Sequence, residues 1–235
     1  MHIMSMATTI IPMLESLNSQ RGIILASGSP RRKELMQLMG FTSTIVRVSG
    51  FAEDLNKASF ASAADYCLAT ASAKGKDVVE SMLSKGEWKS KESILISADT
   101  IVEIDNIILE KPADAEEAKA MLRRLSGRKH AVHTGVAIFS GMYHNKEQSE
   151  TAVVEVPPRR SFIESTEVEF VSLSEEDIAA YVATGEPFDK AGGYGIQGIG
   201  GLMVRSVSGC YFNVMGLPIH RLSRTLADMH RDQLI

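Results

Sequence analysis

The chain of 235 residues has few cysteines, few aromatic residues and no long hydrophobic run. Cys67 and Cys210 are its two cysteines, and their separation matches no metal-binding or redox spacing, which argues against a disulfide scaffold and a zinc site. No apolar stretch reaches the roughly 18 residues of a membrane-spanning helix, and no secretory signal pattern opens the chain. We therefore expect a protein of a reducing compartment, located in the cytoplasm and without a membrane partner.

An excess of positive charge is also missing. The 25 Lys and Arg residues face 29 Asp and Glu residues, which gives a net charge of -4. Since no overall positive field draws this chain to nucleic acid, we do not expect nucleic acid as a partner. With 44% apolar and 23% charged residues, the composition is that of a globular protein with a sizeable core. At about 150 residues per domain, the length fits one large domain or two small lobes.

Segments typical of strands and helices alternate along the chain. Residues 23–26 form a short apolar strand pattern, and a helix is predicted after it, with Ser29 as N-cap and Pro30 at the first helical position. Further strands are expected at 41–48, 94–102, 131–139 and 167–171 and within 202–214, and further helices at 58–79, 114–127, 174–182 and 218–229. This alternation predicts an α/β or α+β fold with a mixed sheet.

The remaining segments are expected to be loops and turns. Residues 1–21 are interpreted as a loose N-terminal extension, and residues 84–93 and 140–160 as surface loops. Asp105 and Asn106 lie between two apolar stretches and predict a two-residue hairpin. This hairpin would return the chain toward Lys111.

The turn at residues 27–32 has the composition of a phosphate site. A helix N-terminus offers free backbone N–H groups and the positive end of its dipole, and hydroxyls and guanidiniums surround that point here. The competing interpretation is a capped helix with two solvated arginines, because short motifs often match by chance.

Asp99 lies in the middle of a strongly apolar strand pattern. Aspartate is disfavoured in strands, and a buried carboxylate without a partner is costly unless it finds a cation or a metal. The predicted hairpin would bring Lys111 back beside Asp99. The pattern leaves two interpretations of Asp99: a carboxylate with a role in function, or a structural carboxylate bonded to a nearby turn.

Residues 193–198 match the pattern G-x-G-x-x-G, so a dinucleotide-binding oxidoreductase has to be considered. That fingerprint should follow a strand, open a helix and precede an acidic residue by about 20 positions, and none of these conditions holds here. We interpret the segment as a loop that lets the backbone approach a ligand or another strand closely. His130 and His133, three apart on a predicted strand, point to opposite faces and predict no metal pair.

Taken together, six segments resemble the Maf-like family. They occur in the family's order across about residues 22–226, and their sequences are ILASGSPRRKEL (24–35), SADTIV (97–102), LEKP (109–112), LRRLSGR (122–128), DKAGGYGIQG (189–198) and VMGLP (214–218). The resemblance implies a single catalytic domain over residues 22–235. It also implies an elongated mixed sheet with flanking helices and two lobes around a deep cleft, in a homodimer.

The resemblance implies a house-cleaning nucleoside triphosphate pyrophosphatase that cleaves between the α and β phosphates. Magnesium or manganese is the expected cofactor. The family's catalytic aspartate falls on Asp99, its loop acid on Glu53 with Asp54 as the alternative, and its catalytic lysines on Lys74 and Lys111. Glu53 and Asp99 are also the expected metal ligands.

The phosphate chain of the substrate is expected to meet the basic turn. Ser27, Ser29, Arg31 and Arg32, together with the two lysines, can neutralise and position a triphosphate. In the subgroup that the chain resembles, Arg31, Thr100 and Gln197 select dTTP and UTP.

A glutamine amide can pair with both O4 and N3–H of uracil or thymine, which gives that preference a physical basis. A sister subgroup for methylated GTP carries an extra tryptophan before the arginines and a glutamine after the aspartate, and both are absent here. The alternative function is a non-enzymatic nucleotide-binding role in cell division.

Overall fold

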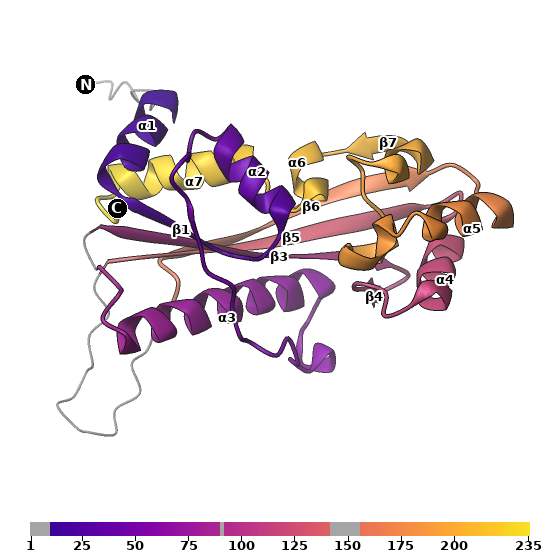
Figure 1. Ribbon diagram of the computed structural model, residues 1–235, viewed down its shortest axis with the longest axis horizontal. Coiled ribbons are helices and arrows are strands. Elements are labelled where there is room, and N and C mark those ends of the chain that lie inside the picture. The colour runs from indigo at the N-terminus through magenta and orange to yellow at the C-terminus, as the bar shows by residue number, and fades with distance from the viewer. Residues whose placement is uncertain (1–9, 90–91, 142–155) are drawn as a thin grey trace.

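A computed structural model describes residues 10–89, 92–141 and 156–235, and within them seven strands form one mixed sheet along the length of the molecule (Figure 1). The strands are β1 (Gly22–Ala26), β2 (Ile45–Val46), β3 (Ser93–Ile104), β4 (Ile107–Leu109), β5 (Lys129–Ser140), β6 (Arg160–Phe170) and β7 (Val204–Ser208). The α-helices are α1 (Ile10–Gln20), α2 (Pro30–Leu38), α3 (Ala63–Ser84), α4 (Ala115–Leu125), α5 (Glu175–Ala183), α6 (Tyr211–Met215) and α7 (Ile219–Arg231). Short 3-10 helices are η1 (Lys57–Ser59), η2 (Glu186–Asp189), η3 (Ala191–Gly193) and η4 (Ile199–Met203).

The strand order is β2-β1-β3-β5-β6-β7, and β4 pairs with the end of β3. β1 runs parallel to β2 and β3, because helical connections return the chain to the same end of the sheet. The other pairings are antiparallel. The predicted mixed α/β sheet is therefore confirmed.

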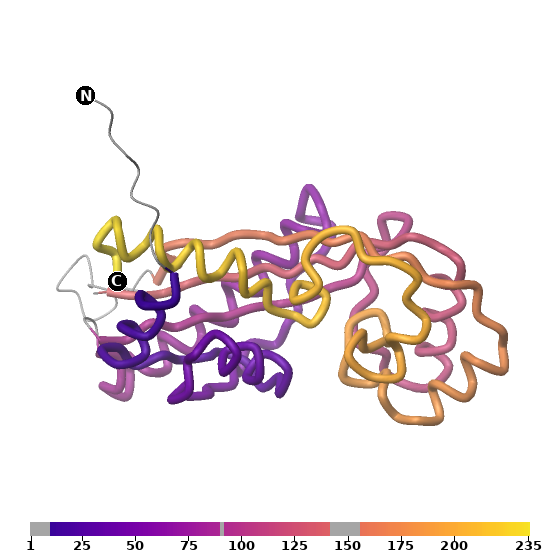
Figure 2. The backbone as a smooth tube through the Cα atoms, turned by 90° about the horizontal axis from the view of Figure 1, so that it is seen from above, coloured from indigo at the N-terminus to yellow at the C-terminus, as the bar shows by residue number. Residues whose placement is uncertain are grey.

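Helices cover both faces of the sheet in the first lobe. On one face, α1, α2 and α7 pack against apolar side chains of β1, β3, β5 and β6. The long α3 lies on the other face (Figures 1 and 2). There its Val78 and Val79 share an apolar cluster with Ala137 and Phe139 of β5. Strand residues that alternate between the two faces supply both cores.

The far ends of β3, β5 and β6 enter a second lobe. There Val102, Val132 and Val168 join side chains of α4 and α5 in a separate apolar cluster. Three strands thus pass through both lobes.

Several predicted boundaries were wrong. Residues 10–20 of the supposed loose extension form α1, whose Met13, Leu14 and Leu17 are buried in the first core. The strand predicted at 41–48 is only Ile45–Val46, because a turn precedes these two residues and only they pair in register with β1. The strand predicted at 167–171 begins already at Arg160, since it pairs along nearly the whole of β5.

Two more segments differ from the expectation. Residues 202–214 divide into η4, β7 and α6 rather than forming one strand. In the predicted loop 84–93, Trp88 is buried and lies in the apolar cluster under α3. Most of the predicted 140–160 loop lies outside the described residues.

Local signals in the sequence were more reliable. Asp105 and Asn106 both take positive φ and close the β3–β4 hairpin. Ser29 and Asp114 cap α2 and α4, and Ser174 forms a capping box at α5. Both cysteines are free, and among the described residues no helix is long and apolar enough to cross a bilayer.

Candidate active site

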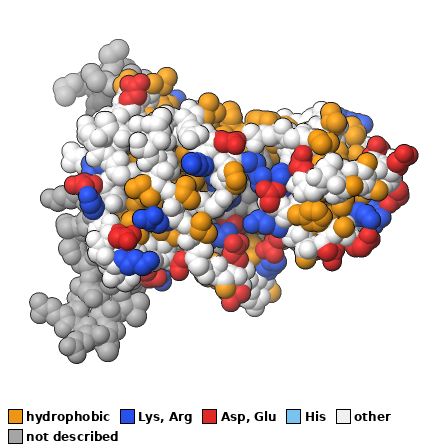
Figure 3. Space-filling view, viewed as in Figure 1, with side chains coloured by type: hydrophobic (Ala, Val, Ile, Leu, Met, Phe, Trp, Pro, Cys, Tyr) orange, Lys and Arg blue, Asp and Glu red, His pale blue; other side chains and the backbone are white. Residues whose placement is uncertain are grey.

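A cleft of about 890 Å³ separates the two lobes. Its first wall is the β1–α2 turn with α3 and the centre of β3, and its second wall is the segment from η2 to the Gly-rich loop. Lys, Arg, Asp and Glu side chains gather in the middle of the face shown in Figure 3. All ten predicted site residues line this one cleft: Ser27, Ser29, Arg31, Arg32, Glu53, Lys74, Asp99, Thr100, Lys111 and Gln197.

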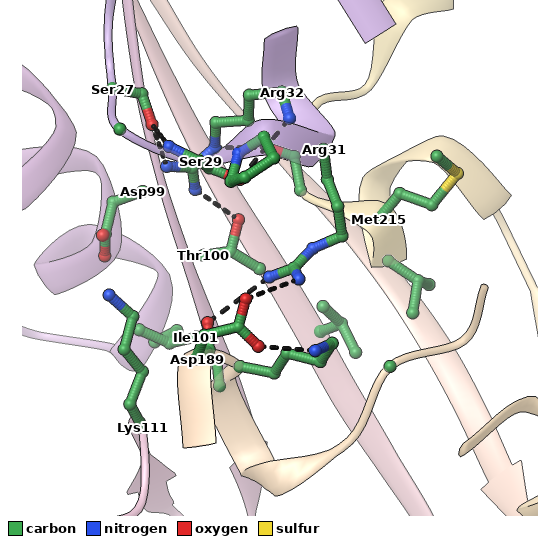
Figure 4. Close-up of a pocket in the computed structure, with 18 of the residues that line it drawn as sticks. Ser27, Ser29, Arg31, Arg32, Asp99, Thr100, Ile101, Lys111, Asp189 and Met215 are labelled. Carbon is green, nitrogen blue, oxygen red and sulfur yellow. Dashed lines mark hydrogen bonds and ion pairs between the residues drawn. The ribbon is translucent and has the colours of Figure 1, made fainter. Parts of the chain in front are cut away.

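Arg32 forms the rigid part of the first wall. Its guanidinium donates to the Ser27 hydroxyl at 3.0 Å, to the Thr100 hydroxyl at 2.9 Å and to the Gly216 carbonyl at 2.9 Å (Figure 4). Burial lowers the pKa of Arg32, and the charge of Asp99 acts against that shift. Three fixed hydrogen bonds therefore hold Arg32 in place before any ligand arrives.

The two serines of the turn already have structural partners. Ser29 accepts a hydrogen bond from the Arg32 backbone N–H at 3.4 Å as the N-cap of α2. Ser27 accepts from the Ser29 N–H at 3.2 Å as well as from Arg32. The turn is therefore a capped helix N-terminus, as the competing interpretation held. This N-terminus also lines the cleft, where it can face an anion.

Lys74 joins two carboxylates at the floor of the cleft. Its Nζ lies 2.7 Å from Asp99 Oδ1 and 2.7 Å from Glu53 Oε2. The Asp99 and Lys74 side chains are 12% and 13% exposed, whereas that of Glu53 is 50% exposed. A buried carboxylate therefore has its cation, and a second carboxylate reaches the same cation from the solvent side.

Two glycines allow α3 to lie close enough to the sheet for this contact. A Cβ at Gly135, directly opposite Asp99 in β5, would lie 2.7 Å from the Leu68 Cα of α3. A Cβ at Gly75 would enter the ring of Phe139 and lie 2.5 Å from the Ser97 hydroxyl. Because neither glycine carries a side chain, α3 can bring Lys74 to Asp99.

The loop that carries Glu53 is fixed at both ends. Asp77 of α3 accepts from the Ser49 hydroxyl at 2.7 Å and from the Gly50 N–H at 2.8 Å. Beyond Glu53, Lys57 pairs with Glu110 at 2.8 Å. Glu53 itself has a φ of 56°, a left-handed conformation that is uncommon outside glycine.

Lys111 returns to the cleft after the β3–β4 hairpin, as expected, but Asp99 has another partner. The ammonium that pairs with Asp99 is that of Lys74, and within the described ranges Lys111 Nζ has no hydrogen bond or ion pair. Figure 4 shows the Lys111 amine directed toward the Asp99 side of the cleft. Lys111 is therefore a free cation beside an already paired carboxylate.

Arg31 reaches across the cleft to the second lobe. Its Nη1 lies 3.0 Å from Asp189 Oδ2, and Lys190 Nζ lies 2.5 Å from Asp189 Oδ1 (Figure 4). Burial alone would raise the pKa of Asp189, but the two cations outweigh it and lower the pKa. The positive charges of Arg31 and Lys190 therefore stabilise a negatively charged group at the position of the Asp189 carboxylate.

Thr100 and Gln197 lie in different surroundings. The Thr100 hydroxyl accepts from Arg32 and lies 2.9 Å from the Thr134 hydroxyl, so it belongs to the wall that holds Arg32. Gln197 is exposed at the edge of the cleft, on the Gly-rich loop. The G-x-G-x-x-G segment is thus a loop at a ligand-sized cleft and not a strand-to-helix turn.

Sequence reasoning did not single out four acidic residues that organise the site: Asp77, Glu110, Glu186 and Asp189. Glu110 and Asp189 lie inside the segments LEKP (109–112) and DKAGGYGIQG (189–198) that carry the family resemblance, and this position was the available signal. Asp77 follows Lys74 by three residues, nearly one helical turn, and therefore lies close to it on the helix surface. Nothing in the sequence marks Glu186, whose partners Tyr181, Ile199 and Gly200 are brought to it only by the folding of the loop between them.

The donor set fits a divalent cation that also binds phosphate. Within the residues described, no group of three or more His, Cys, Asp or Glu side chains could hold a metal alone. Glu53 and Asp99, however, reach the same point, and each has a second oxygen. Magnesium is commonly held by one or two carboxylates together with substrate phosphates, and this pair is suited to that arrangement.

The fold and the cleft define an α/β protein whose two lobes enclose a cleft lined by five basic and five acidic side chains. The family model described as Maf-like protein matches residues 22–229, and the chain belongs to the Maf-like family. This finding agrees with the resemblance carried by the six sequence segments.

Relatives with printed names cover most of the chain. A "dTTP/UTP pyrophosphatase" of Bacillus cytotoxicus is 47% identical over 203 residues, covering 86% of this chain and 93% of the relative. One of Bacillus cereus is 44% identical over 212 residues, covering 90% and 97%. A human "Probable bifunctional dTTP/UTP pyrophosphatase/methyltransferase protein" is 42% identical over 94% of this chain, but the match spans only 34% of that longer protein.

Proposed function

We propose that this protein is a nucleoside triphosphate pyrophosphatase that hydrolyses dTTP, UTP and related pyrimidine nucleotides to the monophosphate and pyrophosphate. The observation that carries the proposal is the pairing of Asp99 and Glu53 on Lys74 at the floor of a cleft lined with cations. The printed names of the two bacterial relatives support the same activity.

In this reaction, water attacks the α-phosphorus and the bond to the bridging oxygen of pyrophosphate breaks. Asp99 is the buried carboxylate that orients the water and accepts its proton. Lys74 lies beside it and balances the negative charge that gathers on the phosphoryl oxygens. Lys111, whose ammonium has no partner among the described residues, binds the departing pyrophosphate.

Arg31 and Arg32 have different tasks in this scheme. Arg32 is fixed by three hydrogen bonds and supplies a charge that needs no rearrangement. Arg31 exchanges the Asp189 carboxylate for a phosphate oxygen when substrate enters.

Glu53 and Asp99 would hold a magnesium or manganese ion together with the substrate phosphates. Such an ion polarises the phosphoryl group and lowers the pKa of bound water. The left-handed backbone of Glu53 and the two anchors of its loop keep that carboxylate directed toward Asp99.

The test is a panel of canonical and modified nucleoside triphosphates with magnesium or manganese, scored for pyrophosphate release. We expect UTP and dTTP to be turned over faster than GTP and ATP, and chelation of the metal to abolish release. Binding of nucleotide without pyrophosphate release would support the non-enzymatic role instead. Saturable binding of a nicotinamide cofactor, followed by fluorescence, would favour an oxidoreductase.

A homodimer and a cytoplasmic location belong to the same proposal. Light scattering coupled to size-exclusion chromatography measures the first, with a mass near twice 25.6 kDa as the expected result. Fractionation of cells that produce the tagged full chain measures the second.

A further inference from the structure

The loop that presents Gln197 is held by two residues of the second lobe. The Gly195 N–H donates to the Tyr181 hydroxyl at 3.1 Å, and that hydroxyl donates to Glu186 Oε1 at 2.9 Å. Glu186 also accepts from the N–H groups of Ile199 at 2.9 Å and Gly200 at 3.1 Å. The backbone on both sides of Gln197 is therefore tied to one Tyr–Glu pair.

The glycine pattern of this loop follows from that contact. A Cβ at Gly198 would lie 2.6 Å from the Glu186 carboxyl carbon, and one at Gly200 would lie 2.7 Å from the Tyr181 hydroxyl. Gly198, the last glycine of the apparent dinucleotide fingerprint, thus makes room for Glu186, and Gly200, two residues beyond it, makes room for Tyr181.

Both residues keep the charge state that these hydrogen bonds require. Burial would raise the pKa of Glu186, but the N–H groups of Gly200 and Ile199 and the Tyr181 hydroxyl outweigh it and lower the pKa. Burial raises the pKa of Tyr181, so its hydroxyl stays protonated and can donate. Near neutral pH the carboxylate therefore accepts all three hydrogen bonds.

We propose that Glu186 and Tyr181 are positioning residues that set the place of Gln197 and thereby the preference for pyrimidine nucleotides. This inference rests on the proposed function. Gln197 is exposed, and no side-chain hydrogen bond fixes its amide within the described part of the chain, so its placement depends on its backbone. The Tyr–Glu pair supplies that backbone restraint without donating to the base itself.

A Glu186→Gln variant tests the carboxylate and a Tyr181→Phe variant tests the hydroxyl. A glutamine cannot accept on both sides, because its NH2 group would face one of the backbone N–H donors. Phenylalanine fills the same space but neither donates to Glu186 nor accepts from Gly195. We expect each variant to lower the UTP-to-GTP ratio of kcat/KM by about five- to tenfold, mainly through a higher KM for UTP, with kcat within about threefold.

Matched controls separate positioning from general damage. Glu175→Gln changes a carboxylate of α5 that pairs with Arg123 away from the cleft, and Tyr211→Phe removes an exposed hydroxyl. Neither control should change the ratio. In a Gln197→Ala background, Tyr181→Phe should leave the ratio unchanged, because the two substitutions act through the same amide.

An unchanged ratio in both variants, with wild-type melting temperatures, would overturn the inference. So would additive effects of Tyr181→Phe and Gln197→Ala on the ratio, or equal losses for UTP and GTP, which indicate a purely structural role. If the wild-type protein releases no pyrophosphate from any nucleotide, the proposed function itself fails. If the wild type is active but the UTP-to-GTP ratio is the same in the Glu186 and Tyr181 variants, only the positioning role fails.

Discussion

Single residues at the floor of the cleft have distinct electrostatic roles that their types alone do not reveal. Lys74 and Lys111 are both lysines that line the cleft, yet one contacts two carboxylates and the other contacts none in the described ranges. Asp99 is buried, whereas Glu53 is half exposed. These differences lead to two predictions.

Asp99→Asn should lower turnover of UTP by at least about a hundredfold, because the amide keeps the shape but cannot accept the proton of the attacking water. The fold should survive, as the amide oxygen still accepts from Lys74. Steady-state pyrophosphate release and thermal melting together measure both parts. Turnover within a few-fold of wild type would remove Asp99 from the chemistry.

Lys74→Ala and Lys111→Ala should both weaken triphosphate hydrolysis but differ in stability. Loss of Lys74 leaves the buried Asp99 without its cation and should lower the free energy of unfolding by about 1–3 kcal/mol, a moderate value because the cleft is open to water. Lys111→Ala should unfold like the wild type. Urea titration of both variants tests the contrast, and equal stabilities would contradict the assigned pairing.

Sequence reasoning at this scale identified the residue types of the site but not their contacts. The carboxylate in the middle of an apolar strand pointed to Asp99 on physical grounds, and the family resemblance supplied Glu53, Lys74 and Lys111. The pairing of Asp99 with Lys74 depends on how closely α3 approaches the sheet, which no local pattern reports.

At the scale of elements, the sequence predicted helix caps and tight turns better than it predicted the lengths of strands and helices. The cap of α2 and the Asp105–Asn106 hairpin depend on a few adjacent residues and were predicted correctly. The length of β6 depends on its pairing with β5, and α1 is helical because its apolar side chains are buried against the first core. Tertiary contacts decide such features, so propensity patterns missed them.

The close packing of α3 gives a prediction at this scale. Gly75→Ala should destabilise the protein by about 1–3 kcal/mol despite the better helix propensity of alanine, because the new Cβ would enter the ring of Phe139. It should also lower kcat, since Lys74 is the adjacent residue. Lys76→Ala, an exposed change on the same helix, is the control, and both melting and activity are measured. A Gly75→Ala protein that matches this control would show that the helix can shift without cost.

At the scale of the whole molecule, His130 makes stability depend on pH. Burial lowers its pKa from 6.5 to about 4. The folded state therefore binds this proton less readily than the unfolded state. The contribution of neutral His130 to the free energy of unfolding is complete above pH 6.5 and is lost as the pH falls toward 4.

Between pH 7.5 and 4.5, the wild type should lose about 2–3 kcal/mol more stability than a His130→Gln variant, which cannot take up the proton. Urea unfolding at both pH values measures this difference. The comparison is made within each protein, so that the loss of the contact with Tyr194 at 2.9 Å cancels. Parallel pH profiles would show that His130 titrates normally in the folded state.

The passage of β3, β5 and β6 through both lobes also limits how such a protein can change by recombination. The two walls of the cleft are not separable modules, since any cut between the lobes crosses three paired strands, and each apolar cluster takes its residues from segments far apart in the sequence. A gene that acquires half of this sequence would therefore gain neither a folded lobe nor half a binding site. Fusion to another coding sequence should succeed only when the unit is inherited whole, and the human relative carries its match as one stretch within a chain about three times as long.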